Sequence, residues 1–202
     1  MNKSSFNRFT LDWYQMGLTE YIILVNPDEN VYEKVMCEKE NFHDKFAADI
    51  AIKTLPHITL ANILAKAQIE NLLCDCLESI CKLQHSFTVA LKNFGGFRPH
   101  TIYINILRSG PFNQLINNMR VLDRILGQNG CPPLHLATKL HMTIARNLEE
   151  WIYNKAIIEY IERSFSEIFT LIKLTLLKRN SRYKKWEKVG DFFLPTERTL
   201  FN

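Results

Sequence analysis

Hydrophobic residues follow two spacings along the chain, one typical of helices and one typical of strands. Helical patterns cover residues 29–46, 66–83, 112–126 and 149–163. Short apolar runs or strict alternation predict strands at residues 20–25, 55–61, 87–91, 101–107, 139–145, 169–177 and 186–194. The pair Gly95–Gly96 is expected to end the third strand, so that the third and fourth strands form a hairpin.

The order strand, helix, strand, strand occurs twice, beginning near residue 56 and again near residue 140. The interval from His57 to Phe87 is 30 residues, and the matching interval from His141 to Phe169 is 28. This internal repeat predicts an α+β fold with two pseudo-symmetric lobes, each an antiparallel sheet flanked by outer helices, with a cleft between them. No linker is long enough to separate independent domains, so residues 1–202 are expected to form a single two-lobed domain.

Each copy of the repeat opens with a His-x-Thr triplet. In a strand, residues i and i+2 project from the same face, so His57 shares a face with Thr59, and His141 with Thr143. The apolar residues between and after them are expected to face a helix-covered core. If the two lobes face each other, two imidazoles and two hydroxyls converge on one cleft. The alternative is that both histidines are ordinary strand residues with local hydrogen-bond partners.

Such a group of side chains suits phosphoryl transfer without a metal ion. A histidine with a pKa near 6.5 takes a proton from water or gives one to a leaving oxygen near neutral pH. Threonine hydroxyls donate hydrogen bonds to the non-bridging phosphate oxygens and stabilise the charge that develops there. A 2',3'-cyclic phosphate, already activated by ring strain, is a substrate of the right kind. We therefore predict His57 and His141 as acid and base, with Thr59 and Thr143 holding the phosphate.

Composition excludes several other classes of protein. The net charge of +4 fits an anionic substrate but lacks the strong basic excess of a DNA-binding domain. No apolar run is long enough to span a membrane, and the N-terminal 17 residues lack the apolar core of a signal peptide. The five cysteines include no C-x-x-C pair, which favours reduced thiols in the cytoplasm. No zinc-ligand spacing is present, so neither a metal nor a cofactor is expected, and we predict a monomer.

The two triplets resemble the paired motifs of the 2H phosphoesterase superfamily, in the branch of 2'-5' RNA ligases and RNA 2',3'-cyclic phosphodiesterases. The residues that carry the resemblance are Pro-His-Ile-Thr-Leu at 56–60 and His-Met-Thr-Ile-Ala-Arg at 141–146. Further matches lie between residues 87 and 103 and at Phe-Phe-Leu of 192–194. Leu140 departs from the proline that many members have before the second histidine. The resemblance implies a bilobal fold with a V-shaped cleft, no metal, and both His–Thr pairs at the base of the cleft.

Other residues are candidate substrate contacts. Arg146 follows the second motif and suits a phosphate, while Phe97 and Tyr103 lie in a hairpin that is placed to line the cleft. The turn over residues 178–186 mixes basic residues with Tyr183, a pattern typical of nucleic-acid contacts. For each of these candidates the alternative is surface packing.

The predicted function is metal-independent hydrolysis of 2',3'-cyclic phosphates on RNA ends or nucleotides, with reversible 2'-5' RNA ligation as a further activity of the same site. Two alternatives stay open. The chain is a non-catalytic RNA- or nucleotide-binding module of the same fold, or it is an enzyme that acts on a small phosphoester other than RNA. RNA ends or cyclic nucleotides are accordingly the expected partners.

Overall fold

The computed structural model describes residues 13–196, so most of the N-terminal segment considered above lies outside the described residues. Within this range the strands are β1 (Leu18–Val25), β2 (Ile58–Lys66), β3 (Phe87–Phe97), β4 (Thr101–Leu107), β5 (His135–Leu136), β6 (His141–Ala145), β7 (Ser166–Leu171), β8 (Lys173–Arg179) and β9 (Glu187–Phe193). The helices are α1 (Glu29–Phe46), α2 (Glu70–Lys82), α3 (Gly110–Asn118), α4 (Val121–Gln128) and α5 (Glu150–Glu162). The 3-10 turn Ala67–Ile69 leads into α2. The predicted α+β class is therefore confirmed.

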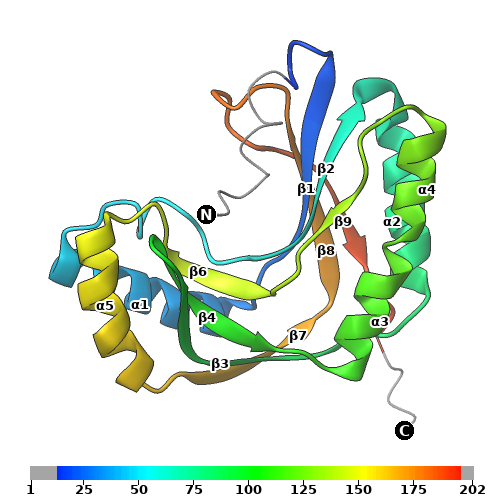
Figure 1. Ribbon diagram of the computed structural model, residues 1–202. Helices are drawn as coiled ribbons and strands as arrows, with labels where there is room; N and C mark the ends of the chain where they lie inside the picture. The colour runs from blue at the N-terminus through cyan, green and yellow to red at the C-terminus, as the bar shows by residue number, and fades with distance from the viewer. Residues whose placement is uncertain (1–12, 197–202) are drawn as a thin grey trace, which may run out of the picture.

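All strands within residues 13–196 belong to one antiparallel sheet, in the order β7-β3-β4-β6-β2-β1-β8-β9, with β5 paired to β2. Figure 1 shows this sheet strongly curled, with the helices on its outer side. We call the opposite side of the sheet its inner face. Strand β2 meets β6 at one register pair, Ile58↔Met142, and meets β5 at Ala61↔Leu136 and Asn62↔His135. This junction joins the two halves of the sheet.

The two sequence repeats do not form one sheet each. Strands β3 and β4 of the first copy pair with β6 and β7 of the second, whereas β2 of the first copy lies with β1, β8 and β9. The expected division into two separate sheets is thus replaced by one continuous sheet whose halves exchange strands. As a result, the two strands that carry the His-x-Thr triplets are neighbours.

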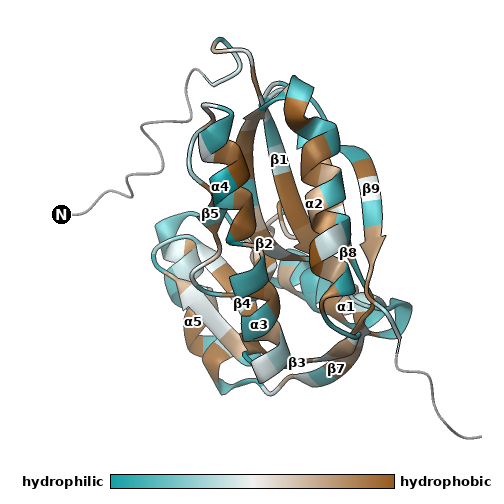
Figure 2. Cartoon of the chain, turned by 90° about the vertical axis from the view of Figure 1, so that its right-hand side faces the viewer, coloured by the Kyte–Doolittle hydropathy of each residue, from teal (hydrophilic) through white to brown (hydrophobic). Residues whose placement is uncertain are grey.

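The outer helices pack on an extensive core. In α2 the residues Leu73, Leu77, Ile80 and Cys81 are buried, whereas the remaining positions are more exposed. Figure 2 shows hydrophilic and hydrophobic residues mixed along α2 and α4, which stand on either side of the largely hydrophobic strand β1 in this view. The apolar residues of the two triplet strands, Ile58, Leu60, Met142 and Ile144, are fully buried, as the alternation predicted. No helix within residues 13–196 is long and apolar enough to cross a membrane.

Two strand predictions were wrong. The predicted strand 169–177 is two strands, because the chain leaves the β7 edge at Ile172 and enters β8 between β1 and β9. The pair Gly95–Gly96 does not end β3, which continues to Phe97. A Cβ atom on Gly95 would lie 2.9 Å from the Tyr103 ring, and one on Gly96 would lie 2.4 Å from the Tyr153 hydroxyl. Both glycines therefore allow close packing on the two faces of a continuing strand.

Local signals set the ends of the helices. The Asp28 side chain accepts a hydrogen bond of 2.9 Å from the Val31 amide and begins α1, which ends at Ala47 in the left-handed region. Ser109 caps α3, and Pro111 lies in its first turn as predicted. The predicted helix over 112–126 is divided into α3 and α4, since residues 119–120 interrupt the regular helix.

Candidate active site

The register pair Ile58↔Met142 places the two His-x-Thr triplets side by side. Because β2 and β6 are antiparallel, His57 on one side of this register pair lies next to Thr143, and Thr59 on the other side lies next to His141. All four side chains are half-buried, while the intervening Ile58 and Met142 are fully buried. The two histidines and two threonines therefore share the inner face of the sheet.

Both histidines make the same local hydrogen bond. The Nδ1 atom of His57 lies 2.7 Å from the carbonyl oxygen of Leu55, and Nδ1 of His141 lies 2.9 Å from that of Lys139. A carbonyl oxygen only accepts, so Nδ1 must carry the proton in each ring. In the neutral imidazole the other nitrogen, Nε2, then keeps its lone pair. Each ring is held by the residue two positions earlier, and each presents a basic nitrogen.

The surroundings lower the pKa of both histidines. For His57 the main cause is burial, followed by the positive charges of Arg146, Lys39 and His141, against which the hydrogen bond to Leu55 acts. For His141 the main cause is again burial, and the Lys139 charge adds to it against the effect of the hydrogen bond to the Lys139 carbonyl. Both shifts favour the neutral form of the two rings in the free protein.

Two of the predicted contact residues lie against His141. The ring centroids of Phe97 and Tyr103 are 5.0 and 5.2 Å from that of His141, and 4.5 Å from each other. The Lys139 ammonium lies 4.8 Å from the centroid of the Tyr103 ring and donates a hydrogen bond to its hydroxyl. An aromatic wall with a cation thus borders the second triplet. Lys139 was missed as a site residue, although it lies two positions before His141 in the predicted strand 139–145.

Lys39 of α1 is a second charged residue that could not be assigned to the site from the sequence pattern. Its side chain is fully buried, and its ammonium donates hydrogen bonds of 2.9 Å to the carbonyl oxygens of both Thr143 and Ile144, and of 3.2 Å to the hydroxyl of Thr54. Burial, reinforced by the Arg146 charge, lowers the pKa of Lys39 to about 8. The ammonium is therefore mostly charged at pH 7, directly behind the second triplet strand.

The remaining predicted contacts differ in their distance from the histidines. Arg146 is exposed just beyond β6, and its charge reaches His57. Tyr183 is 79% exposed in the turn between β8 and β9, where the Arg182 guanidinium lies 5.2 Å from its ring centroid. Within residues 13–196, no hydrogen bond, ion pair or ring contact joins Tyr183 to either histidine. The structure therefore brings Arg146 to the site but leaves Tyr183 at the surface.

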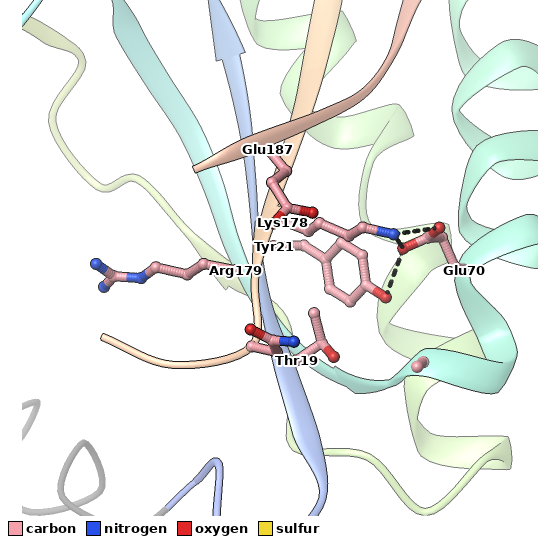
Figure 3. Close-up of a pocket in the computed structure, with 8 residues that line it drawn as sticks. Thr19, Tyr21, Glu70, Lys178, Arg179 and Glu187 are labelled. Carbon is pink, nitrogen blue, oxygen red and sulfur yellow. Dashed lines mark hydrogen bonds and ion pairs between the residues drawn. The ribbon is translucent and has the colours of Figure 1, made fainter. Parts of the chain in front are cut away.

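The first two basic residues of the predicted nucleic-acid turn form ion pairs. Lys178 and Tyr21 both bind Glu70 of α2, with a Lys178–Glu70 distance of 2.8 Å, and Figure 3 shows Arg179 pointing to the other side. Arg179 pairs with Glu20 at 2.5 Å. Lys178 thus faces the helices and ties β8 to α2, so it is unavailable to a ligand on the inner face. The exposed basic residues of this turn are Arg182, Lys184 and Lys185.

The described residues offer neither a metal-binding cluster nor a disulfide. Among residues 13–196, no cluster of three or more His, Cys, Asp or Glu side chains is arranged to hold a metal ion. The five cysteines are free thiols.

Solved structures share this architecture. TT0787 of Thermus thermophilus superposes with a TM-score of 0.67 at 16% identity, over 89% of this chain and 100% of that chain. LigT of E. coli superposes with a TM-score of 0.61 at 17% identity (89% and 99% covered), and its complex with 3'-AMP with 0.63 at 16% (88% and 98% covered). No curated protein matches the sequence itself.

These likenesses define a LigT-like fold. Residues 41–182, which include both His-x-Thr triplets, match the 2'-5' RNA ligase superfamily. The chain belongs to this superfamily of 2H phosphoesterases, as the resemblance of its two motifs predicted.

Proposed function

We propose that this protein is a metal-independent phosphodiesterase that hydrolyses 2',3'-cyclic phosphates on RNA ends or nucleotides. The observation that carries the proposal is the matched pair of histidines on one sheet face, each with Nδ1 bound to a backbone carbonyl and Nε2 left as a base. The family places the chain among phosphodiesterases and ligases of the 2H type.

In the proposed reaction the two histidines act on opposite sides of the phosphorus. One Nε2 takes a proton from water while the water oxygen forms a bond to phosphorus. The P–O bond of the strained ring breaks, and the other histidine, in its protonated form, gives its proton to the leaving oxygen. The same step with a ribose 5'-hydroxyl in place of water forms a bond from O5' to phosphorus and expels the 3'-oxygen, which takes the proton, and would join RNA ends by a 2'-5' bond; the reverse step would cleave that bond. The orientation of the substrate decides which of His57 and His141 is the base.

Hydrogen bonds and positive charge support the phosphate in this proposal. Thr59 and Thr143 donate their hydroxyl protons to the non-bridging oxygens, where negative charge grows in the transition state. Arg146 and Lys39 add fixed positive charge near His57, which favours an anionic ligand over a neutral one. Binding of the anion in turn favours protonation of the histidine that must act as the acid.

The nucleotide part of the substrate is proposed to contact the aromatic wall. Phe97 borders His141 on the inner face and is half-buried, so one side of its ring is accessible to a base. The complex of E. coli LigT with 3'-AMP, a nucleoside monophosphate bound to a protein of the same fold, supports a nucleotide here. Tyr183 would contact only a longer RNA strand, through the exposed turn. We further propose that the protein acts as a monomer in the cytoplasm.

Hydrolysis of 2',3'-cyclic nucleotides and of RNA with a cyclic-phosphate end, measured in EDTA, tests the proposal. We expect turnover that resists EDTA and falls by at least about 10²-fold in each of the variants His57→Ala and His141→Ala. Thr59→Val and Thr143→Val should lower kcat because each removes one donor to the phosphate. Circular dichroism and thermal unfolding establish that the variants fold.

Other outcomes would favour the alternatives. Unchanged turnover in both histidine variants would refute the two-histidine mechanism. Tight binding of cyclic-phosphate RNA without turnover over hours would identify a binding module. Turnover of other phosphoesters, with no activity on RNA ends or cyclic nucleotides, would identify an enzyme of small-molecule metabolism.

A further inference from the structure

A cavity of about 280 Å³ lies on the inner face beside the two triplets. Its apolar wall consists of Leu24, Leu55 and Leu177, and its polar end holds Lys173 and Asp191. Small-ligand sites typically combine an apolar wall with a few polar groups in this way. The predicted acid, base and phosphate-binding residues do not line this cavity, so the proposed chemistry leaves it unexplained.

The sheet register places this cavity in line with the proposed phosphate site. Thr59 of β2 is opposite Leu24 of β1, Leu24 is opposite Thr175 of β8, and Thr175 is opposite Asp191 of β9. Neighbouring strands are about 4.8 Å apart, so Thr175 lies roughly 10 Å from Thr59 along this row. Leu55 connects the two places directly, because its side chain lines the cavity while its carbonyl oxygen holds His57.

The polar end of the cavity is organised to bind an anion. Lys173 and Lys188 place their ammonium groups 2.8 and 2.6 Å from one oxygen of Asp191, and the Thr175 hydroxyl donates to the other oxygen at 2.7 Å. Burial alone would raise the pKa of Asp191, but these three hydrogen bonds lower it to about 2. At neutral pH, two ammonium groups thus share one carboxylate, and the cluster keeps a net charge of +1.

Both ammonium groups remain accessible. The side chains of Lys173 and Lys188 are 35% and 57% exposed. Each ammonium has three N–H donors, and only one of them is needed for the bond to Asp191. The carboxylate fixes the two cations next to each other before any ligand arrives, which reduces the entropy lost on binding.

We propose that this cavity is a subsite for the second nucleotide of an RNA whose cyclic-phosphate end occupies the triplet site. The leucine wall takes the nucleobase, and Lys173 with Lys188 binds the phosphodiester that links the two nucleotides. The two lysines contact Asp191, one strand beyond Thr175, and the curled sheet turns the inner-face side chains of this row toward one another, so the linking phosphodiester reaches the lysines while the cyclic end stays at the triplets. The inference rests on the proposed function and narrows its substrate class to oligonucleotides, because a cyclic mononucleotide has no second phosphate for Lys173 and Lys188 to bind.

The test compares a 2',3'-cyclic mononucleotide with a dinucleotide that has the same cyclic end. For the wild type we expect kcat/KM to be at least about tenfold higher for the dinucleotide. The double variant Lys173→Gln/Lys188→Gln should lower the ratio of the two kcat/KM values by about tenfold, and Lys188→Gln alone by less. The charge-matched control, Lys82→Gln/Lys155→Gln, changes two exposed lysines of the outer helices and should keep the wild-type ratio.

Two results would overturn the subsite: equal kcat/KM for both substrates in the wild type, or an unchanged ratio in the Lys173→Gln/Lys188→Gln variant. If neither substrate is hydrolysed, the proposed function is wrong, and the subsite is then tested by measuring binding affinities. Calorimetry then compares a dinucleotide that ends in a 3'-phosphate with the corresponding mononucleotide. Affinity lost by the double variant for the dinucleotide alone supports the subsite, and equal affinities for both ligands in the wild type refute it.

Discussion

The substitution Lys39→Met removes a charge that the fold holds entirely away from water. Burial, with the Arg146 charge, lowers the pKa of Lys39 from 10.5 to about 8, while the unfolded chain restores the higher value. Between these two pKa values the unfolded chain binds more protons than the folded one, so the free energy of unfolding of the wild type rises with pH. Methionine does not titrate, and the variant lacks this contribution.

The size of the effect follows from the two pKa values. Integrated from pH 7 to pH 10, the difference in bound protons is worth about 2.5 kcal/mol. The unfolding free energy of the wild type minus that of Lys39→Met should therefore be about 2.5 kcal/mol larger at pH 10 than at pH 7. Buried tyrosines such as Tyr21 and Tyr160, whose pKa values burial raises, titrate alike in both proteins and cancel in the comparison.

Urea unfolding followed by tryptophan fluorescence, at pH 7 and pH 10 for both proteins, measures this difference. The reasoning is refuted if the difference in unfolding free energy between wild type and variant changes by less than about 0.5 kcal/mol from pH 7 to pH 10. Such a result would mean that the ammonium of Lys39 is hydrated in the folded protein, and that the hydrogen bonds to Thr143 and Ile144 do not take place in a water-excluded site.

Three further predictions concern the site and its support. Because burial lowers both histidine pKa values below 6.5, kcat/KM for a cyclic nucleotide should be highest below pH 6.5, and an optimum above pH 7 would contradict this. Gly96→Ala should cost about 1–3 kcal/mol of stability through the contact with the Tyr153 hydroxyl, whereas Gly127→Ala, with open space around it in α4, should stabilise by up to about 1 kcal/mol in urea unfolding. Lys184→Gln/Lys185→Gln should reduce the salt dependence of kcat/KM for RNA and leave that for a mononucleotide unchanged; equal salt slopes for wild type and variant would contradict an RNA contact at this turn.

Local patterns in the sequence were sufficient to predict those helices and strands in which buried side chains recur at a regular interval. Helix α1 and strand β4 have the predicted limits, and the alternation across both triplets identified which side chains are buried. These features depend on neighbours within one strand or one helical turn. Each His-x-Thr triplet is such a local pattern, so both triplets could be identified from the sequence before any long-range contact was known.

The division at Ile172 was missed although the sequence contains a signal for it. Phe169 and Leu171 are buried in β7, so a continuing strand would bury residue 173, but the next buried apolar residues are Leu174 and Leu176. This change of parity means that the chain turns over between the two strands. Which strands β7 and β8 pair with depends on contacts far apart in sequence, and the alternation does not contain that information.

Lys39 could also have been found from its position. It lies on the helix stripe of α1 that contains Val31, Val35, Phe42 and Phe46, all of them buried. A lysine on such a stripe must either extend to solvent or find partners inside. Its partners are backbone carbonyls of β6, and the helical spacing alone cannot supply them.

The exchange of strands between the two repeats explains how the site is held together. Had each repeat formed its own sheet, the distance between His57 and His141 would depend on how two lobes pack. In this fold β2 and β6 are neighbours in one sheet, and the pair Ile58↔Met142 fixes their register through the backbone. A register slip by one residue would turn one triplet to the buried side. The geometry of the two histidines is thus set by backbone pairing, which substitutions in the helix-covered core leave intact as long as the sheet forms.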